Sequence, residues 1–108
     1  MKKSRLGEFQ ELILMSVIVL KEDAYGNEIQ RQLESLLKER LSTGAIQTAL
    51  KRMEEKGFLT SQWGEATSER GGRRKRIYEA TALAYEVLQE MRSVRDQLWQ
   101  RMPNLKPI

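Results

Sequence analysis

The 108-residue chain contains no cysteine and no histidine. Without thiols, disulfide bonds and thiolate redox chemistry are excluded, and without imidazoles the commonest zinc ligand and general base are missing. A transition-metal site would have to use carboxylates alone, which such ions rarely do. The sequence also shows no nucleophile–base pair and no glycine-rich phosphate loop that opens a helix. It therefore predicts a protein that is not an enzyme and that has no metal site and no cofactor.

Long hydrophobic runs are also scarce. The longest, residues 12–20, is shorter than the roughly 20 residues that a membrane-spanning helix needs. Basic residues precede this run, as in a signal peptide, but Lys21-Glu22-Asp23 follows directly, without a small-residue cleavage site. We therefore expect a cytoplasmic protein with no membrane partner, in which a first helix from about Gly7 to Leu20 is buried.

Positive charge is concentrated in one segment. The formal net charge of the chain is only +4, and five cations gather near residue 73: Arg70, Arg73, Arg74, Lys75 and Arg76. Because these five exceed the net charge, the rest of the chain is slightly acidic. A localised positive excess is typical of a phosphate-binding surface. A solvated charged loop is the alternative interpretation.

Hydrophobic spacing predicts a second helix with Asp23 as its N-cap. The expected buried stripe of this helix consists of Tyr25, Ile29, Leu33, Leu36 and Leu37.

A third helix is predicted from Ser42, a favourable N-cap, to Lys56, with Gly57 as its left-handed end. Its apolar stripe consists of Ile46, Ala49, Leu50 and Met53. The opposite face is polar and suits a DNA groove, although many solvated helix faces look the same; it presents Thr43, Gln47, Thr48, Lys51 and Arg52.

Two short alternating runs, 58–63 and 77–80, flank the basic segment and predict a pair of strands. The order helix, helix, helix, strand, strand, helix is that of a winged helix-turn-helix. We therefore expect a mainly α fold with a small two-stranded β-wing (α+β). Residues 1–80 would form the DNA-binding domain, 81–102 a C-terminal dimerisation helix, and 103–108 a tail.

The last helix should begin after Thr81, and Pro103 should end it. Apolar residues repeat along it at coiled-coil spacing, which favours a homodimer. Packing of this helix on its own domain is the alternative. Trp99 lies beside the repeat and could stack on a flat hydrophobic or aromatic effector, or instead pack the interface together with Tyr85 or the first helix. The expected dimer interface consists of Val87, Met91, Val94, Leu98, Trp99 and Met102.

An ordered set of short motifs resembles the PadR-like transcriptional regulators, in the compact branch with a single C-terminal dimerisation helix. The set runs through Leu6-Gly7-Glu8, Ala24-Tyr25-Gly26-Asn27-Glu28-Ile29, Leu41-Ser42-Thr43-Gly44, Ala49-Leu50-Lys51-Arg52-Met53 and Gly71-Gly72-Arg73-Arg74-Lys75-Arg76-Ile77-Tyr78. It covers the chain from Leu6 to about Met102.

This resemblance implies a dimeric repressor-type protein that binds double-stranded DNA and responds to a small molecule. Gln47 and Ala84 depart from the pattern, because the family usually has an aromatic residue and a glycine there. Gln47 could instead pair with an adenine edge. A protein-interaction module that binds no DNA is the alternative function. The DNA contacts implied or expected are Tyr25, Ser42, Thr43, Gly44, Gln47, Thr48, Lys51, Arg52, Arg73, Arg74 and Lys75.

Overall fold

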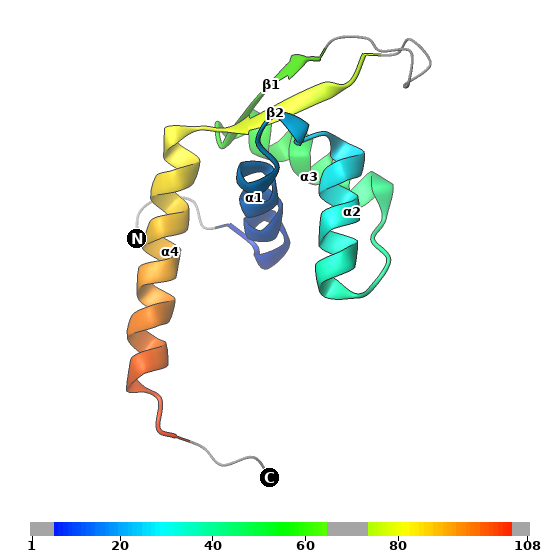
Figure 1. Cartoon of the computed structure of the whole chain (residues 1–108). Coiled ribbons are helices and arrows are strands. Elements are labelled where there is room, and N and C mark those ends of the chain that lie inside the picture. Colours follow the sequence, from blue (N-terminus) through cyan, green and yellow to red (C-terminus); the bar gives the residue numbers. More distant parts are fainter. Residues whose placement is uncertain (1–5, 65–73, 105–108) are drawn as a thin grey trace.

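A computed structural model of the chain describes residues 6–64 and 74–104. It confirms the predicted winged-helix order. The elements are α1 (Glu8–Leu20), a short 3-10 helix η1 (Lys21–Asp23), α2 (Gly26–Leu37), α3 (Thr43–Glu55), β1 (Leu59–Trp63), β2 (Arg76–Ala80) and α4 (Ala82–Arg101). Figure 1 shows α1, α2 and α3 gathered on one side of the two-stranded sheet, while α4 runs away from it. None of the described helices is both long and apolar enough to cross a membrane.

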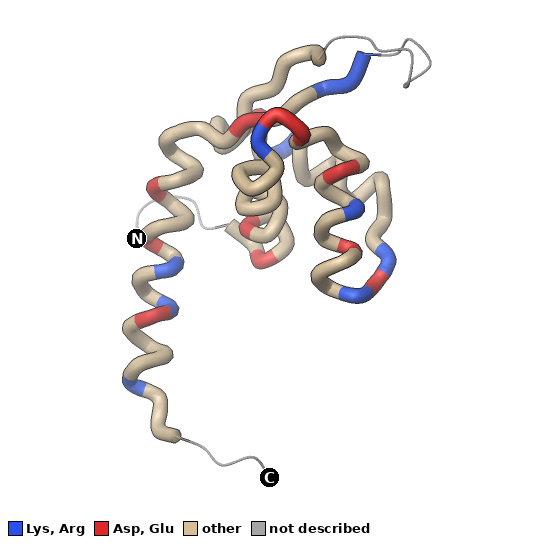
Figure 2. Tube along the Cα trace, viewed as in Figure 1, with Lys and Arg blue, Asp and Glu red and all other residues tan. Residues whose placement is uncertain are grey.

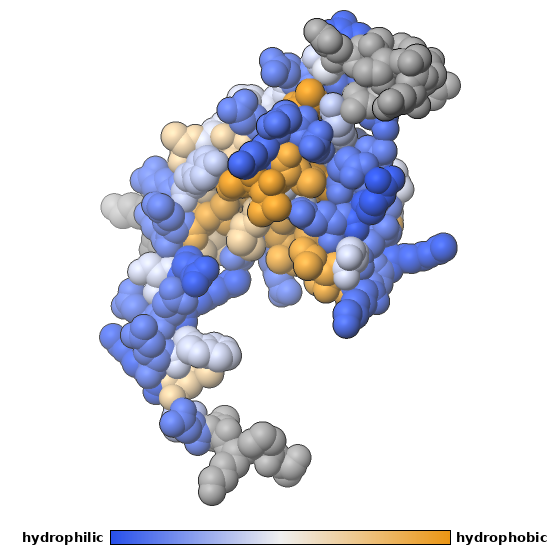
Figure 3. Space-filling view, viewed as in Figure 1, coloured by the Kyte–Doolittle hydropathy of each residue, from blue (hydrophilic) through white to orange (hydrophobic). Residues whose placement is uncertain are grey.

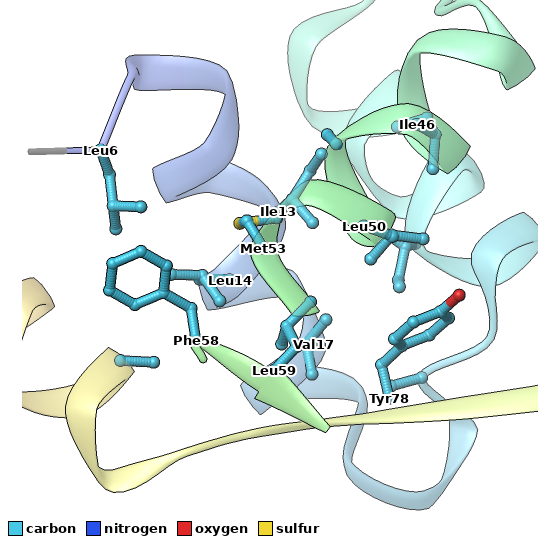
Figure 4. Close-up of a cluster of buried hydrophobic side chains, with 14 of the residues drawn as sticks. Leu6, Ile13, Leu14, Val17, Ile46, Leu50, Met53, Phe58, Leu59 and Tyr78 are labelled. Atoms are coloured by element: carbon cyan, nitrogen blue, oxygen red, sulfur yellow. The ribbon is translucent and has the colours of Figure 1, made fainter. Parts of the chain in front are cut away.

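One hydrophobic core joins α1, α3 and the sheet (Figure 4). The predicted stripe of α3 is confirmed, because all four of its residues are buried. Each fully buried aliphatic side chain contributes about 1.5–3 kcal/mol relative to an exposed one, so this stripe strongly fixes the rotation of α3. The largest fully buried side chains are Ile13, Leu14, Val17, Ile29, Ile46, Leu50, Met53, Leu59 and Val87.

The predicted ends of α3 and α4 are also confirmed. The Ser42 hydroxyl accepts a hydrogen bond from the Ala45 N–H at 3.1 Å, and Gly57 adopts a φ of +85° just after α3. The Thr81 hydroxyl accepts from the Ala84 N–H at 3.3 Å and donates to the Gly57 carbonyl at 2.7 Å. The same side chain therefore begins α4 and ties it to the end of α3.

The predicted start of α2 is wrong. Asp23 lies in η1, and α2 begins at Gly26 after an extended Tyr25. The reason is a tertiary contact with β2. Tyr25 forms an antiparallel bridge with Ile77, and the Ala24 carbonyl accepts a hydrogen bond from the Tyr78 N–H at 3.0 Å. These pairings hold the backbone extended where the sequence favours an earlier helix.

The predicted apolar stripe of α2 is only partly buried. Ile29 and Leu33 are in the core, whereas Leu36 is 72% exposed and Leu37 is 39% exposed. Both leucines lie in the last turn of the helix, just before the left-handed Lys38, and this turn reaches past the core. Helical periodicity shows which face is apolar but not how much of its length is covered.

The two strands are antiparallel, with Leu59 opposite Ala80, Ser61 opposite Tyr78 and Trp63 opposite Arg76. These residues share one face, which packs on the core at its inner end, where Leu59 and Tyr78 are buried. The expected wing tip lies outside the described residues, and with it Arg70, Gly71, Gly72 and Arg73.

The predicted apolar repeat of α4 divides into two halves. Val87 is only 1% exposed, and Met91 is half-buried against the core. Arg95 then forms an ion pair with the buried Glu11 of α1 at 2.8 Å. Beyond it, the apolar side chains are exposed, including Trp99 at 73%.

Burial raises the pKa of the Tyr78 phenol above its ordinary value of 10.0; the Glu54 carboxylate adds to the rise and Arg76 opposes it. The unfolded chain therefore loses this proton at a lower pH than the folded protein does. We expect the free energy of unfolding to decrease as the pH rises above about 10, until the pKa of the folded state is passed. Urea denaturation across this range should show a shallower decrease for Tyr78→Phe. Identical slopes for the two proteins would contradict this.

Candidate nucleic-acid interface

The outward face of α3 is polar and open. Burial of the apolar stripe turns the five polar residues predicted for groove contact toward solvent, and Thr43, Gln47, Thr48, Lys51 and Arg52 are all exposed. Gly44 also lies on this helix, where an added Cβ would meet only the Ser42 hydroxyl, at an ordinary 3.6 Å. Packing within the protein therefore does not require glycine at this position. The small residue leaves room for a closely approaching partner.

The segment that leads into α3 is held by two side chains of α2. The Glu34 carboxylate accepts a hydrogen bond from the Leu41 N–H at 2.8 Å, and the Gln30 amide donates to the Leu41 carbonyl at 2.9 Å. The Thr43 hydroxyl donates to the other end of the same amide, at 3.1 Å from Gln30 Oε1. With its proton engaged, Thr43 presents a methyl group and a lone pair to a partner.

Sequence reasoning missed Gln30 and Glu34. They look like part of an ordinary solvated helix face. Their i, i+4 spacing shows that they lie side by side, but nothing local indicates that the chain returns over them.

Gln47 lies against the first turn of α2. A Cβ on Gly26 would come within 2.6 Å of Gln47 Nε2 and 3.9 Å of Leu50 Cδ1. The absence of a side chain at Gly26 therefore makes room for the Gln47 amide. Tyr25, which precedes Gly26, is half-buried beside this contact. The structure thus brings together two predicted DNA-contact positions, Tyr25 and Gln47, that are 22 positions apart in the numbering.

The described part of the basic segment lies at the outer end of β2 (Figure 2). Arg74 is exposed, and its Nε donates to the Gly64 carbonyl at 3.1 Å. Lys75 is half-buried, and its carbonyl accepts from the Gly64 N–H at 2.6 Å. These contacts close the base of the wing. Arg73, the remaining predicted contact on the wing, lies outside the described residues.

Arg76 has a more ordered environment than the sequence indicates. Its guanidinium lies over the Trp63 ring, 4.9 Å from the centroid. Its Nε donates to the Ser61 hydroxyl at 2.7 Å, and that hydroxyl donates to the Glu54 carboxylate of α3 at 2.8 Å. A Trp near the end of one strand and an Arg near the start of the next were visible in the sequence. Their pairing depends on the strand register, which a long intervening segment does not specify.

Exposed apolar side chains also occur on α1 and on the far half of α4. Val94, Leu98, Trp99 and Met102 are exposed on α4, and Met15 and Val19 are 41% and 64% exposed on α1. Figure 3 shows apolar surface over α1, between α4 and α2. A groove of about 540 Å³ separates α1 from α4 and includes Met15, Leu88 and the buried Glu11 in its lining. Sequence reasoning missed the α1 contribution, because an almost wholly apolar helix is usually enclosed.

Three helices, of which the third has an exposed polar face, and a two-stranded wing define a winged helix-turn-helix protein. The chain belongs to the transcriptional regulator PadR-like family, which matches residues 14–90. No curated protein sequence matches the chain significantly.

Solved structures show the same fold. A PadR family transcription regulator from Clostridium difficile is 33% identical, with 83% of this chain and 95% of that chain covered and a TM-score of 0.58. A PadR-like regulator from Bacillus cereus is 22% identical, with coverage of 88% and 93% and a TM-score of 0.62. Bacillus subtilis PadR, solved in complex with operator DNA, is 17% identical, with coverage of 93% and 50% and a TM-score of 0.62.

The contact between Gly26 and Gln47 predicts the effect of Gly26→Ala. The new Cβ would stand 2.6 Å from Gln47 Nε2, so the flexible amide should swing away. We expect the NMR resonances of the Gln47 side-chain amide to shift, while the free energy of unfolding changes by less than about 1 kcal/mol.

Gly44→Ala is the matched control, because its Cβ would touch only the Ser42 hydroxyl at 3.6 Å. The Gln47 amide resonances should stay in place in this variant. Equal shifts in the two variants, or none in either, would show that Gly26 does not position Gln47.

Proposed function

We propose that this protein is a sequence-specific DNA-binding regulator that acts as a homodimeric repressor in the cytoplasm. The observation that supports this most directly is the open polar face of α3 beside a cationic wing. A helix of this kind can enter a major groove while neighbouring cations meet the phosphates. The Bacillus subtilis relative, solved with operator DNA, supports the same use of the fold. A dimer that covers a promoter represses by excluding polymerase.

In this proposal the two surfaces have different tasks. Arg73, Arg74 and Lys75 contact phosphates, which give affinity but carry no sequence information. Thr43, Gln47, Thr48 and Lys51 read base edges. Arg52, Ser42, Gly44 and Tyr25 lie near the backbone at the rim of the groove. Gln47 is the residue best suited to an adenine, because its amide can donate and accept together.

Fluorescence anisotropy tests this division of tasks, with a duplex from upstream of the protein's own gene and a scrambled duplex of equal length. We expect log K to fall linearly with log salt concentration. Arg73→Ala combined with Arg74→Ala should weaken binding to both duplexes alike. Gln47→Ala should instead reduce the preference for the native duplex by about tenfold.

A salt slope near zero would count against DNA binding and favour the protein-interaction alternative. A loss of preference on removal of the two arginines, with affinity for the scrambled duplex unchanged, would show that the wing is wrongly assigned.

The proposed dimer uses the surface formed by Met15 and Val19 of α1 and the far half of α4. Several exposed apolar side chains on two helices favour a partner, and a closed twofold dimer is the commonest solution. Because Val87 belongs to the protomer's own core, the interface starts at Met91 and continues through Val94, Leu98, Trp99 and Met102.

Leu98→Glu should convert the dimer to a monomer in analytical ultracentrifugation, because it places a charge in an apolar interface. Gln97→Glu adds the same charge at the next position, where the side chain is exposed and donates to Ser93. This control should remain dimeric. A monomeric wild-type protein, or a dimeric Leu98→Glu variant, would overturn the proposed interface.

We further propose that a small hydrophobic or aromatic effector stacks on Trp99 near the dimer axis and alters the spacing of the two α3 helices. Titration of aromatic drugs and phenolic compounds into Trp63→Phe, where Trp99 is the remaining tryptophan, should quench its fluorescence saturably. Trp99→Phe should show no such quenching with the same ligand. The absence of quenching across a broad panel would reject Trp99 as the effector site.

A further inference from the structure

Arg76 stands out among the described cations because three side chains from two elements hold it. Trp63 lies beneath the guanidinium, Ser61 fixes Nε, and Glu54 receives the Ser61 proton. We call Glu54, Ser61 and Trp63 the Arg76 support. Most surface arginines move among many rotamers, and they lose this freedom when they bind. The Arg76 support has already removed much of that freedom.

The support leaves the binding end of the side chain available. Among the residues that the structure describes, the two terminal nitrogens of Arg76 have no hydrogen-bond partner, and Arg76 is exposed. Within residues 6–64 and 74–104, the hydrogen bond of this guanidinium is the one that Nε donates to Ser61. The terminal pair can therefore donate two parallel hydrogen bonds to one anionic group, as phosphate recognition by arginine requires.

The direction of Arg76 follows from the strand register. Trp63 and Arg76 share the sheet face whose inner end, Leu59 and Tyr78, is buried in the core. Ser61, which lies between Leu59 and Trp63 on this face, donates a hydrogen bond to Glu54 in the last turn of α3. Arg76 therefore lies on the face that continues outward from α3. A phosphate bound there would belong to the backbone that borders the groove occupied by α3.

Trp63 itself is 54% exposed, although a tryptophan at the end of a strand could have turned toward the core. Its exposed position costs hydrophobic burial but gives the guanidinium a flat surface. A cation above an aromatic ring is attracted by the ring's quadrupole, and Arg can also stack on it. The guanidinium is thus held on one side by the ring and along one edge by Ser61.

We propose that Arg76 is a fixed phosphate contact at the base of the wing, that Trp63 is its positioning residue, and that the Glu54–Ser61 bond couples this contact to α3. This rests on the proposed DNA-binding function and adds to it a contact that does not depend on the wing tip. The ligand is a backbone phosphate of the duplex. Its effect is on affinity for every sequence, because phosphates are the same in all of them.

The test measures anisotropy with the native and scrambled duplexes across a salt series. Arg76→Gln should weaken binding to both duplexes by about tenfold, as expected for loss of a charge-assisted hydrogen bond. Its log K against log salt slope should become shallower by about 0.9 for each protomer that loses a phosphate contact. Arg101→Gln is the matched control, because it removes the same charge from the far end of α4 and should change neither value.

Substitutions at Trp63 and at Arg76 distinguish a role of Trp63 in positioning Arg76 from a role in the stability of the hairpin alone. Trp63→Leu should weaken binding about threefold, the scale of an exposed cation–π contact, whereas Trp63→Phe should retain wild-type affinity. Arg76→Lys should keep the salt slope but lose affinity, because an ammonium lacks the flat stacking surface and Nε. Melting temperatures establish that each variant is folded. If Trp63→Leu is not folded, Arg76→Lys serves as the test.

If Arg76→Gln binds as tightly as Arg101→Gln to a duplex that the wild-type protein binds, the proposed phosphate contact is wrong. The proposed DNA-binding function would still stand. If Trp63→Leu melted earlier but bound like the wild type, the pair would be only a hairpin contact. A wild-type protein that binds neither duplex would reject both the proposed function and this inference.

Discussion

The burial of one apolar stripe on α3 is the constraint on which the rest of the structure depends. Ile46, Leu50 and Met53 are inaccessible to water, and their burial fixes the rotation of the helix. Residues one position away on a helix point about 100° elsewhere, so Gln47 and Lys51 are turned outward by the same event. The free energy that folds this domain therefore also selects which side chains of α3 face the solvent.

Rotation alone does not fix the polar face of α3, and further side-chain contacts complete it. Gln30 and Glu34 hold the segment before Thr43, Gly26 leaves room for the Gln47 amide, and Glu54 receives the bond that ends at Arg76. Three of these four residues belong to α2, and Glu54 lies on α3 itself. A helix surface held in this way meets a ligand with less conformational entropy left to lose.

The two halves of α4 differ in their surroundings: one is part of the core, and the other is exposed to water. The near half is part of the core through Val87, and the Arg95–Glu11 ion pair marks the point where it leaves α1. The far half extends past it with apolar side chains in water, of which Leu98 and Trp99 are the most exposed. A partner or ligand on that half would leave the core of the domain undisturbed.

The sequence alone determined what depends on near neighbours in the chain: the caps at Ser42 and Thr81, the end at Gly57, the stripe of α3 and the order of the elements. The tertiary structure decided what depends on distant segments. The pairing of Tyr25 with Ile77 makes α2 begin later in the chain than its sequence favours. The strand register places Trp63 opposite Arg76, and the core ends before Leu36, which is therefore exposed. Caps and helical periods act within a few residues, whereas register and coverage depend on where remote segments pack.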